Sequence, residues 1–325
     1  MGMPERAFWH LTDSAVICEM RYPIGVRDTI GSWGNHRCFP SMTDGKRSLT
    51  ELERMRDLRS GKEAMALDDI EGLWRFMGEH CDGGKGTVVF TGAGVSTLSG
   101  IRDFRSQNGV YSAPFEGHQV EDILSLSMFR RDPSIFYRWA KEFCYCLDKY
   151  KPNLVHRVVA RLESLGYTRG VLTQNIDVLH QAAGSKHVYE IHGSPSNHHC
   201  LKCGKAYGYS EIAPRVMRDE VPHCECGGII KPDIVFYEEM LNEQVLETSF
   251  RMAEACQLMI VLGSSLTVQP AASIPLAAVQ SGAKLCIVNA QDTPLDRFST
   301  WRYFDLKSFS EAMTAFMDRS CSASE

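Results

Sequence analysis

Four cysteines of this 325-residue chain are spaced as metal ligands. Two residues separate Cys200 from Cys203, one separates Cys224 from Cys226, and twenty lie between the pairs. Four thiolates at such spacing can close a tetrahedron around Zn²⁺ and leave no position open for chemistry. We therefore predict a structural zinc ion that holds a small module together. The alternatives are four unrelated buried thiols, or a neighbouring histidine as a ligand, for which the candidates are His198, His199 and His223.

Three polar side chains follow apolar runs further upstream and could do chemistry. Asn175 and Asp177 come directly after the run 170–173, and His192 precedes a Gly-Ser pair. Histidine suits a general base because its pKa near 6.5 leaves the ring partly neutral at physiological pH. Each also has a structural interpretation. His192 could be a buried structural residue, Asp177 could cap a helix over 178–183, and Asn175 could bond to main chain.

A glycine turn follows a buried run at 88–91. Gly92 and Gly94 let the backbone turn sharply and let a ligand approach the main chain, and small residues then open a helix. A helix start of this kind commonly binds phosphate. The usual dinucleotide fingerprint is broken, because the next glycine is Gly100. The turn predicts a nucleotide site without identifying it.

The elements that must position these residues alternate along the chain. Apolar runs at 88–91, 170–173, 258–262 and 285–288 each end in small or polar residues, and helical patterns cover 64–79 and 154–165. Helices within 110–150 include one that starts at Asp132-Pro133. This alternation predicts a Rossmann-like α/β fold, a parallel sheet with helices on both faces, plus a small zinc-binding insert. The strands' carboxyl ends would share one ligand-binding crevice.

Composition sets the remaining limits. A net charge of −5 gives no global attraction to nucleic acid or to anionic membranes. The chain shows no signal segment and no apolar run long enough for a bilayer, and we expect its twelve cysteines to be mostly free thiols in the cytoplasm. We expect a poorly ordered extension over 1–64 with a short helix at 49–58, and a natural start at Met65. The catalytic domain would comprise 65–193 and 231–320, and the zinc module 194–230.

Taken together, these motifs resemble the sirtuins, the NAD-dependent protein-lysine deacylases. The resemblance extends over residues 66–316, and no single motif carries it. The matching stretches, besides the cysteine pairs, are Gly92-Ala93-Gly94-Val95-Ser96, Ser99-Gly100-Ile101 with Asp103-Phe104-Arg105-Ser106, Thr173-Gln174-Asn175-Ile176-Asp177 with Leu179-His180-Gln181, Glu190 with His192-Gly193-Ser194, residues 231–239, Gly263-Ser264-Ser265-Leu266 with Val268, Pro270 and Ala271, and Val288-Asn289.

The resemblance implies an enzyme that uses NAD to deacetylate protein lysines, releasing nicotinamide and O-acetyl-ADP-ribose. Asp177 and the Ile101 backbone would hold the nicotinamide carboxamide beside Asn175, and His192 would be the general base on a ribose hydroxyl. Phe104, on a mobile loop, would cover the reactive ribose. The cofactor-binding residues implied are Gly92, Ala93, Gly94, Ser96, Ile101, Asp103, Phe104, Arg105, Gln174, Asn175, Ile176, Asp177, Gly263, Ser264, Ser265, Asn289 and Ala290.

The same resemblance implies how the acetylated protein is bound. The segment 234–239 would pair with the substrate backbone as an added strand, which tolerates many peptide sequences. The substrate-binding residues implied are Val235, Phe236, Tyr237 and Glu238. Family members that remove succinyl or malonyl groups carry a Tyr-x-x-Arg pair after the cofactor loop. That pair is missing from the corresponding stretch of this sequence, which favours acetyl.

Three positions depart from the family pattern. The family usually has proline where Arg102 stands, glycine where Val178 stands and threonine where Ser264 stands. The first two could weaken NAD binding or alter acyl choice. Two alternatives to the deacetylase therefore stay open: a protein ADP-ribosyltransferase, and an NAD-binding regulator that has lost its activity. Dinucleotide-dependent redox chemistry is disfavoured by the broken glycine spacing.

Overall fold

The computed structural model describes residues 67–80, 86–104 and 109–322, which belong to one compact unit, 53–325. The predicted N-terminal extension, its short helix and the proposed start at Met65 lie outside these residues. The predicted Arg105 also lies outside them. Within the described ranges, no helix has the length and apolar character needed to cross a membrane.

A six-stranded parallel sheet forms the larger lobe, with the strand order β3-β2-β1-β7-β8-β9. The prediction of a parallel α/β sheet is confirmed. The four predicted apolar runs form its four central strands, and two three-residue strands add its edges. The strands are β1 (Thr87–Thr91), β2 (Thr168–Thr173), β3 (Val188–Glu190), β7 (Leu258–Leu262), β8 (Lys284–Val288) and β9 (Trp301–Tyr303).

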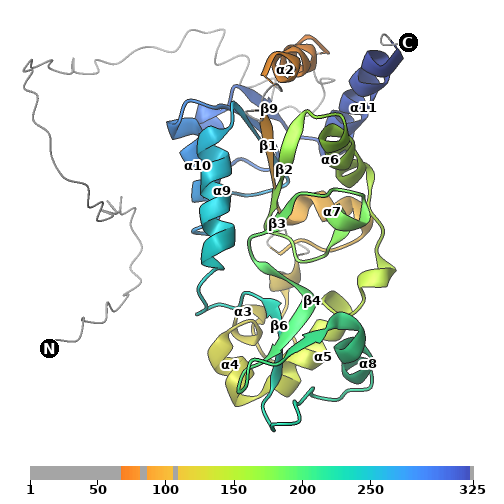
Figure 1. Cartoon of the computed structure of the whole chain (residues 1–325), viewed down its shortest axis with the longest axis vertical. Helices are drawn as coiled ribbons and strands as arrows, with labels where there is room; N and C mark the ends of the chain where they lie inside the picture. Colours follow the sequence, from red (N-terminus) through yellow and green to blue (C-terminus); the bar gives the residue numbers. More distant parts are fainter. Residues whose placement is uncertain (1–66, 81–85, 105–108, 323–325) are drawn as a thin grey trace, which may run out of the picture. The chain divides into compact units, whose positions relative to one another are not determined.

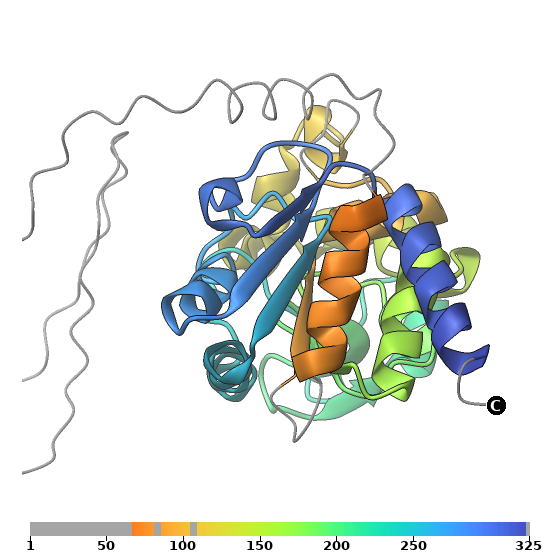
Figure 2. The same cartoon turned by 90° about the horizontal axis from the view of Figure 1, so that it is seen from above.

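Both faces of this sheet are covered by helices, which is why its strands are apolar throughout (Figure 2). Along β1, Val89 points to one face while Val88 and Phe90 point to the other. On the Val89 face pack α2 (Leu67–His80), α6 (Leu154–Ser164) and α11 (Leu306–Ser322). On the opposite face pack α9 (Glu243–Ala255) and α10 (Ser273–Gln280).

A smaller lobe lies beyond one end of the sheet (Figure 1). It contains an antiparallel sheet of three strands, β4 (Gly193–Cys200), β5 (Ala206–Gly208) and β6 (Ile230–Ile234), with helix α8 (Tyr209–Met217). Three helices from the segment between β1 and β2 complete it, α3 (Val120–Ile123), α4 (Leu126–Arg131) and α5 (Pro133–Phe143). Helix α5 starts at the predicted place, where the Asp132 carboxylate accepts from the Ser134 backbone N–H and so caps the helix.

One hydrophobic core joins these three helices to the cysteine insert. Phe129 and Phe136 pack against Phe236, and the same cluster includes Cys200 and Cys224. The segment 110–145, which the sequence analysis assigned to the catalytic domain, therefore shares its core with the zinc-binding module. We propose that these helices and the insert form one structural lobe.

Short turns connect the elements at the ends of the strands. The segment after the glycine turn is a 3₁₀-helix, η2 (Ala93–Ser99), where the sequence suggested an ordinary helix start. Gly100 ends it in the left-handed conformation. The other short elements are η3 (Val110–Ser112), η4 (Leu147–Lys149), α7 (Leu179–Ala182) and η5 (Asp296–Phe298).

Candidate active site and metal centre

The carboxyl ends of β1 and β7 meet in direct backbone contact. A Cβ atom on Gly94 would lie 2.8 Å from the Gly263 Cα atom, and one on Gly92 would lie 2.8 Å from the Gly263 carbonyl oxygen. Gly263 itself has a φ of +60°. The glycines predicted to approach a ligand are thus required first by the contact between these two loops. Together they form the floor of the candidate site.

Asn175 and Asp177 extend from the end of β2 toward this floor. Asn175 is buried, and its Nδ2 donates to the Gly92 carbonyl at 3.1 Å and to Ser96 Oγ at 3.2 Å. Ser96 Oγ in turn donates to Asp177 Oδ2 at 2.6 Å. The other carboxylate oxygen, Oδ1, accepts from the Leu179 backbone N–H at 3.0 Å, at the first residue of α7. Asp177 thus bonds to the start of α7 as well as to Ser96, although the N-cap position itself is Val178.

His192 lies at the same edge, between β3 and β4. Its Nδ1 is 3.0 Å from the Gln174 carbonyl oxygen. A carbonyl oxygen can only accept, so Nδ1 carries the proton and Nε2 is the unprotonated nitrogen of the neutral ring. The His192 carbonyl accepts from the Val235 backbone at 2.8 Å, which ties the imidazole to the predicted substrate segment. The arrangement can accept a proton at Nε2.

Side-chain hydrogen bonds tie together the loops at the carboxyl ends of the strands. Gln174 Nε2 donates to Ser264 Oγ at 2.8 Å and so links β2 to β7. Beyond β8, Arg302 donates to the carbonyl oxygens of Asn289 at 2.8 Å and Gln291 at 2.7 Å. Arg302 is nearly buried and pairs with Asp296 at 3.0 Å, and the sequence alone did not predict it as a residue of the site. No sequence motif surrounds Arg302, and only its contacts with residues elsewhere in the sequence show that it holds the loop after β8.

The remaining predicted cofactor residues surround this centre. The Ile101 backbone N–H donates to the Ser96 carbonyl at 3.2 Å, and Ile176 packs against the small-lobe core. The Phe104 ring lies 5.3 Å from the Tyr111 ring. The Arg102 guanidinium carbon lies 5.5 Å from the centre of the Phe143 ring, so its charge makes a cation–π contact with the small lobe. The predicted residues Ala93, Asp103, Ser265 and Ala290 lie in or next to these loops, and the Ser265 hydroxyl pairs with that of Thr267 at 3.0 Å.

The predicted substrate segment runs from Val235 to Glu238 along α4. Tyr237 pairs with the small lobe through its backbone, and its hydroxyl lies 3.0 Å from that of Tyr111. The Glu238 carboxylate accepts from the Ser127 backbone and hydroxyl, both at 2.9 Å. Phe236 is 2% exposed and lies in the core, and its backbone N–H and carbonyl bond to Glu239, at 2.8 Å to the carboxylate and 3.1 Å to the backbone N–H.

Lys231 also anchors the substrate segment, through contacts with Glu239 and Phe236. Its ammonium group is 2.8 Å from the Glu239 carboxylate and 4.1 Å from the centre of the Phe236 ring. Burial lowers the pKa of Lys231, and the Glu239 carboxylate opposes that shift. An ion pair with cation–π contact compensates the buried charge.

The four predicted metal ligands come together in the small lobe. The four sulfur atoms lie within 4.8 Å of one another, with 3.5 Å between Cys200 and Cys226 and 3.6 Å between Cys203 and Cys224. A tetrahedral zinc with bonds of about 2.3 Å places its sulfur atoms about 3.8 Å apart, so these residues fit the ion. Among the described residues, no histidine joins this group.

The three histidines considered as substitute ligands are engaged elsewhere. His198 is buried against the Tyr145 hydroxyl at 2.8 Å, and burial lowers its pKa to about 4. His199 pairs with Asp233 at 2.7 Å, and His223 bonds to the Val221 carbonyl at 2.9 Å. The metal site therefore uses cysteine alone.

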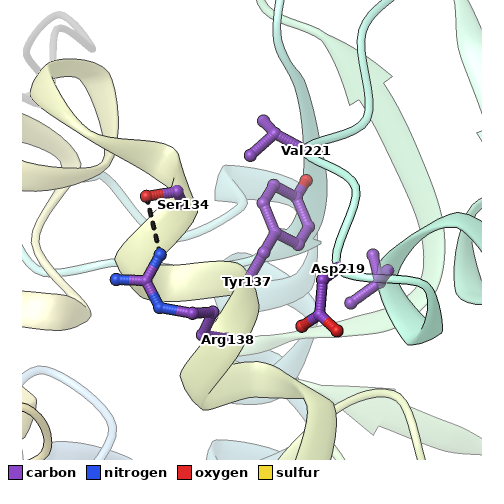
Figure 3. Close-up of a pocket in the computed structure, with 6 residues that line it drawn as sticks. Ser134, Tyr137, Arg138, Asp219 and Val221 are labelled. Carbon is purple, nitrogen blue, oxygen red and sulfur yellow. Dashed lines mark hydrogen bonds between the residues drawn. The ribbon is translucent and has the colours of Figure 1, made fainter.

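A pocket of about 240 Å³ lies on the small lobe, between α5 and the residues after α8 (Figure 3). None of its lining residues belongs to the predicted site. The Arg138 guanidinium donates to Ser134 and forms an ion pair with Glu116, while Tyr137 donates to the Ile230 carbonyl. Because these polar groups are already paired, the pocket offers no evident ligand contacts.

Comparisons with known proteins identify the fold and its chemistry. The sequence profile of the Sir2 family matches residues 92–270. An NAD-dependent protein deacetylase of Thermotoga maritima is 44% identical over 218 residues, which cover 67% of this chain and 87% of that protein. A Sir2 structure with a p53 peptide and NAD⁺ superimposes with a TM-score of 0.68 at 39% identity, covering 77% of this chain and 98% of that one.

A second solved structure contains the products. It is a Sir2 variant with a deacetylated p53 peptide and 3′-O-acetyl ADP ribose. It superimposes with a TM-score of 0.68 at 40% identity and covers 75% of this chain and 97% of that one.

Proposed function

Because this chain belongs to the Sir2 family of NAD-dependent protein deacetylases, we propose that His192 is its general base and that Asn175 and Asp177 form its nicotinamide site. The reaction consumes NAD and an acetylated protein lysine and yields nicotinamide, free lysine and O-acetyl-ADP-ribose. NAD supplies the ADP-ribosyl group that receives the acetyl.

The observation that carries the assignment of His192 is its hydrogen bond to the Gln174 carbonyl, 3.0 Å from Nδ1. This contact fixes the tautomer with Nε2 unprotonated, which is the form that can take a proton from a ribose hydroxyl. The same loop continues into Asn175 and Asp177, so one short segment both orients the base and contributes the amide-binding groups.

Asn175 and Asp177 suit a carboxamide because their side-chain oxygens can accept hydrogen bonds from its NH2 group, while both hydrogens of the Asn175 amide are used on Gly92 and Ser96. Ser96 contacts both and keeps them in register, at 3.2 Å from the Asn175 amide and 2.6 Å from the Asp177 carboxylate. A neutral amide ligand would find matched hydrogen-bonding groups in a mostly buried setting, where an unmatched group is costly. We assign the other predicted cofactor residues to the NAD-binding surface around this centre.

The acetylated lysine would enter along Val235–Glu238. An extended peptide would pair there with the Val235 carbonyl and the Glu238 backbone, because the backbone groups of Phe236 and Tyr237 already bond within the protein. The acetyl group is the expected acyl group, and direct nucleic-acid and membrane binding are not expected. We assign zinc to the four cysteines as a structural ion that supports the peptide-binding lobe. No disulfide joins the described cysteines, which agrees with a reducing compartment, and we propose the cytoplasm.

The test uses the full chain with an acetyl-lysine peptide, with and without NAD. Peptide mass and free nicotinamide are followed together for the wild type, for His192→Ala and for His187→Ala. His187 is the matched control because it is an exposed histidine at the opposite end of β3, paired only with Glu163 at 2.6 Å.

We expect equal release of acetyl and nicotinamide by the wild type and the His187 variant, and at least about a hundredfold loss in His192→Ala, the usual scale of general-base catalysis. Full activity of His192→Ala would refute the assignment. A peptide that gains ADP-ribose would identify an ADP-ribosyltransferase. Tight NAD binding with neither product would identify a regulator that has lost catalysis.

A further inference from the structure

A buried histidine pair lies beneath the candidate site, and neither ring belongs to it. His156 on α6 is 0% exposed and His180 on α7 is 1% exposed. Their ring centres are 4.9 Å apart, with the planes at 63°. His156 Nε2 and His180 Nδ1 are buried without a hydrogen-bond partner among the described residues. Two adjacent buried rings with one unpartnered nitrogen each require an explanation.

The contacts of the other two ring nitrogens fix both tautomers. The Asn153 backbone N–H donates to His156 Nδ1 at 3.3 Å, so Nδ1 is the acceptor and Nε2 carries the proton. The Thr91 hydroxyl donates to Thr173 Oγ1 at 2.8 Å, so its oxygen must accept from His180 Nε2 at 3.0 Å. His180 Nδ1 is then a bare acceptor. The two unpartnered nitrogens are therefore a donor on His156 and an acceptor on the adjacent His180 ring.

The resulting chain of donors runs in one direction. One segment runs from the Asn153 N–H to His156, and the other runs from His180 through Thr91 to Thr173 Oγ1, which also accepts from the Asn175 backbone N–H at 3.1 Å. A donor and an acceptor on adjacent rings can pair directly or through one bridging water, and either link would join the two segments. We propose that His156 and His180 are positioning residues whose one-way hydrogen-bond chain holds the nicotinamide-binding loop at Asn175.

The chain acts on the same segment that makes the site, and the proposal rests on the proposed function of that segment. The start of α6 also reaches the opposite wall, because Asn153 Nδ2 donates to the Val95 carbonyl at 2.7 Å and to Ser99 Oγ at 2.8 Å. One polar network thus supports both the η2 turn and the loop after β2. A buried polar network specifies a single arrangement when all its members are hydrogen-bonded, and the link between the two rings would complete this one.

Neutral rings are required throughout the chain, and their surroundings favour them. Burial lowers the pKa of His156 to about 4, opposed by the Asp177 carboxylate and reinforced by Arg157. Burial, together with His156, lowers the pKa of His180 to about 3. A proton on His180 Nδ1 would place two donors opposite each other and break the chain.

The first measurement is nitrogen NMR of the full chain labelled in its histidine rings, which reads tautomer and charge without any assay of activity. His156→Gln and His180→Gln assign the signals. We expect both rings as the neutral Nε2–H tautomer from pH 5 to pH 8. An Nδ1–H tautomer in either ring, or titration of either ring between pH 6 and pH 7, would overturn the proposal.

The second measurement tests whether the chain positions the site. Thr91→Val keeps the shape and removes the hydroxyl that links His180 to Thr173. Losing a buried hydrogen bond predicts an NAD KM raised about five- to tenfold with kcat changed less than twofold. Thr314→Val is the control, since its hydroxyl bonds only to the Ser310 carbonyl within α11.

Rescue separates a hydrogen-bonding role from simple packing. Gln at position 180 can still donate to Thr91, whereas Leu cannot, so His180→Gln should keep a lower NAD KM than His180→Leu. A wild-type NAD KM in Thr91→Val, or equal values in the two His180 variants, would contradict the positioning role. If the wild type consumes no NAD, the proposed function fails. The tautomers of His156 and His180 measured by NMR would still test the hydrogen-bond chain.

Discussion

Val178 occupies a backbone conformation that a β-branched residue rarely adopts, and relieving it should stabilise the protein. Its φ of +56° and ψ of +16° are left-handed, at the position that starts α7. An L-residue in this region costs about 1–2 kcal/mol, and a β-branched side chain is the least suited to it. Replacement by glycine removes that cost but loses about 0.5–1 kcal/mol through the greater freedom of the unfolded chain. Val178→Gly should therefore gain about 1 kcal/mol.

The assay is reversible unfolding in urea at constant pH, with thermal melting alongside. A gain of about 1 kcal/mol raises the melting temperature by about 2–4 °C in a domain of this size. Val178→Asn should follow glycine closely, because asparagine tolerates the left-handed region, and Val178→Ala should gain less. The reasoning would be refuted if the glycine variant were no more stable than the wild type, or if the alanine variant were as stable as the glycine variant.

The same variants address the concern that Val178 weakens NAD binding. Both carboxylate oxygens of Asp177 are held by partners that do not involve the Val178 side chain, Ser96 at 2.6 Å and the Leu179 backbone at 3.0 Å. We therefore expect the NAD KM of Val178→Gly to change less than about twofold, because the hydrogen bonds that hold Asp177 stay the same. A rise well beyond this would mean that the strained residue itself holds the carboxylate in place.

Three further predictions concern pH, the metal and the substrate segment. The buried neutral histidines have folded pKa values below the unfolded value, so their contribution to stability is complete above about pH 6.5 and is lost as pH falls toward 4. The free energy of unfolding measured in urea should fall by about 2 kcal/mol per histidine between pH 7 and pH 5, and His180→Gln should make this pH dependence less steep. Cys203→Ser should lower bound zinc from about one ion per chain and reduce the melting temperature, whereas Cys256→Ser, outside the cluster, should keep the metal. Glu238→Gln weakens the anchor on Ser127 and should raise the peptide KM severalfold while leaving the NAD KM unchanged, and equal effects on both would contradict a role confined to the peptide segment.

Much of the fold follows from local patterns that the sequence displays openly. Continuous apolar runs such as 258–262 predict strands buried on both faces, and β7 is such a strand. The cysteine spacing likewise predicted a cluster that the coordinates bring together. These signals work because a strand's burial and a metal's geometry each impose a short-range rule on residue type.

Other features depend on contacts between distant segments and have no local signal. The sequence could not indicate that Gly92 and Gly263 lie backbone against backbone, or that Phe236 is core rather than contact surface. Nor could periodicity reveal that the helices at 120–143 pack with the cysteine insert. The site assignments drawn from the family resemblance, including His192, remain predictions until the variants are measured.

The crossing of the glycine loops after β1 and β7 also limits how the enzyme can be redesigned. A single added methyl group at Gly92, Gly94 or Gly263 would meet main-chain atoms within 2.5–2.9 Å, and main chain cannot step aside as a side-chain tip can. Libraries that seek a different acyl group should therefore leave this crossing untouched. They should vary side chains at the edge of the small lobe instead, such as Phe104 and Tyr111, whose rings lie 5.3 Å apart and can be exchanged one at a time.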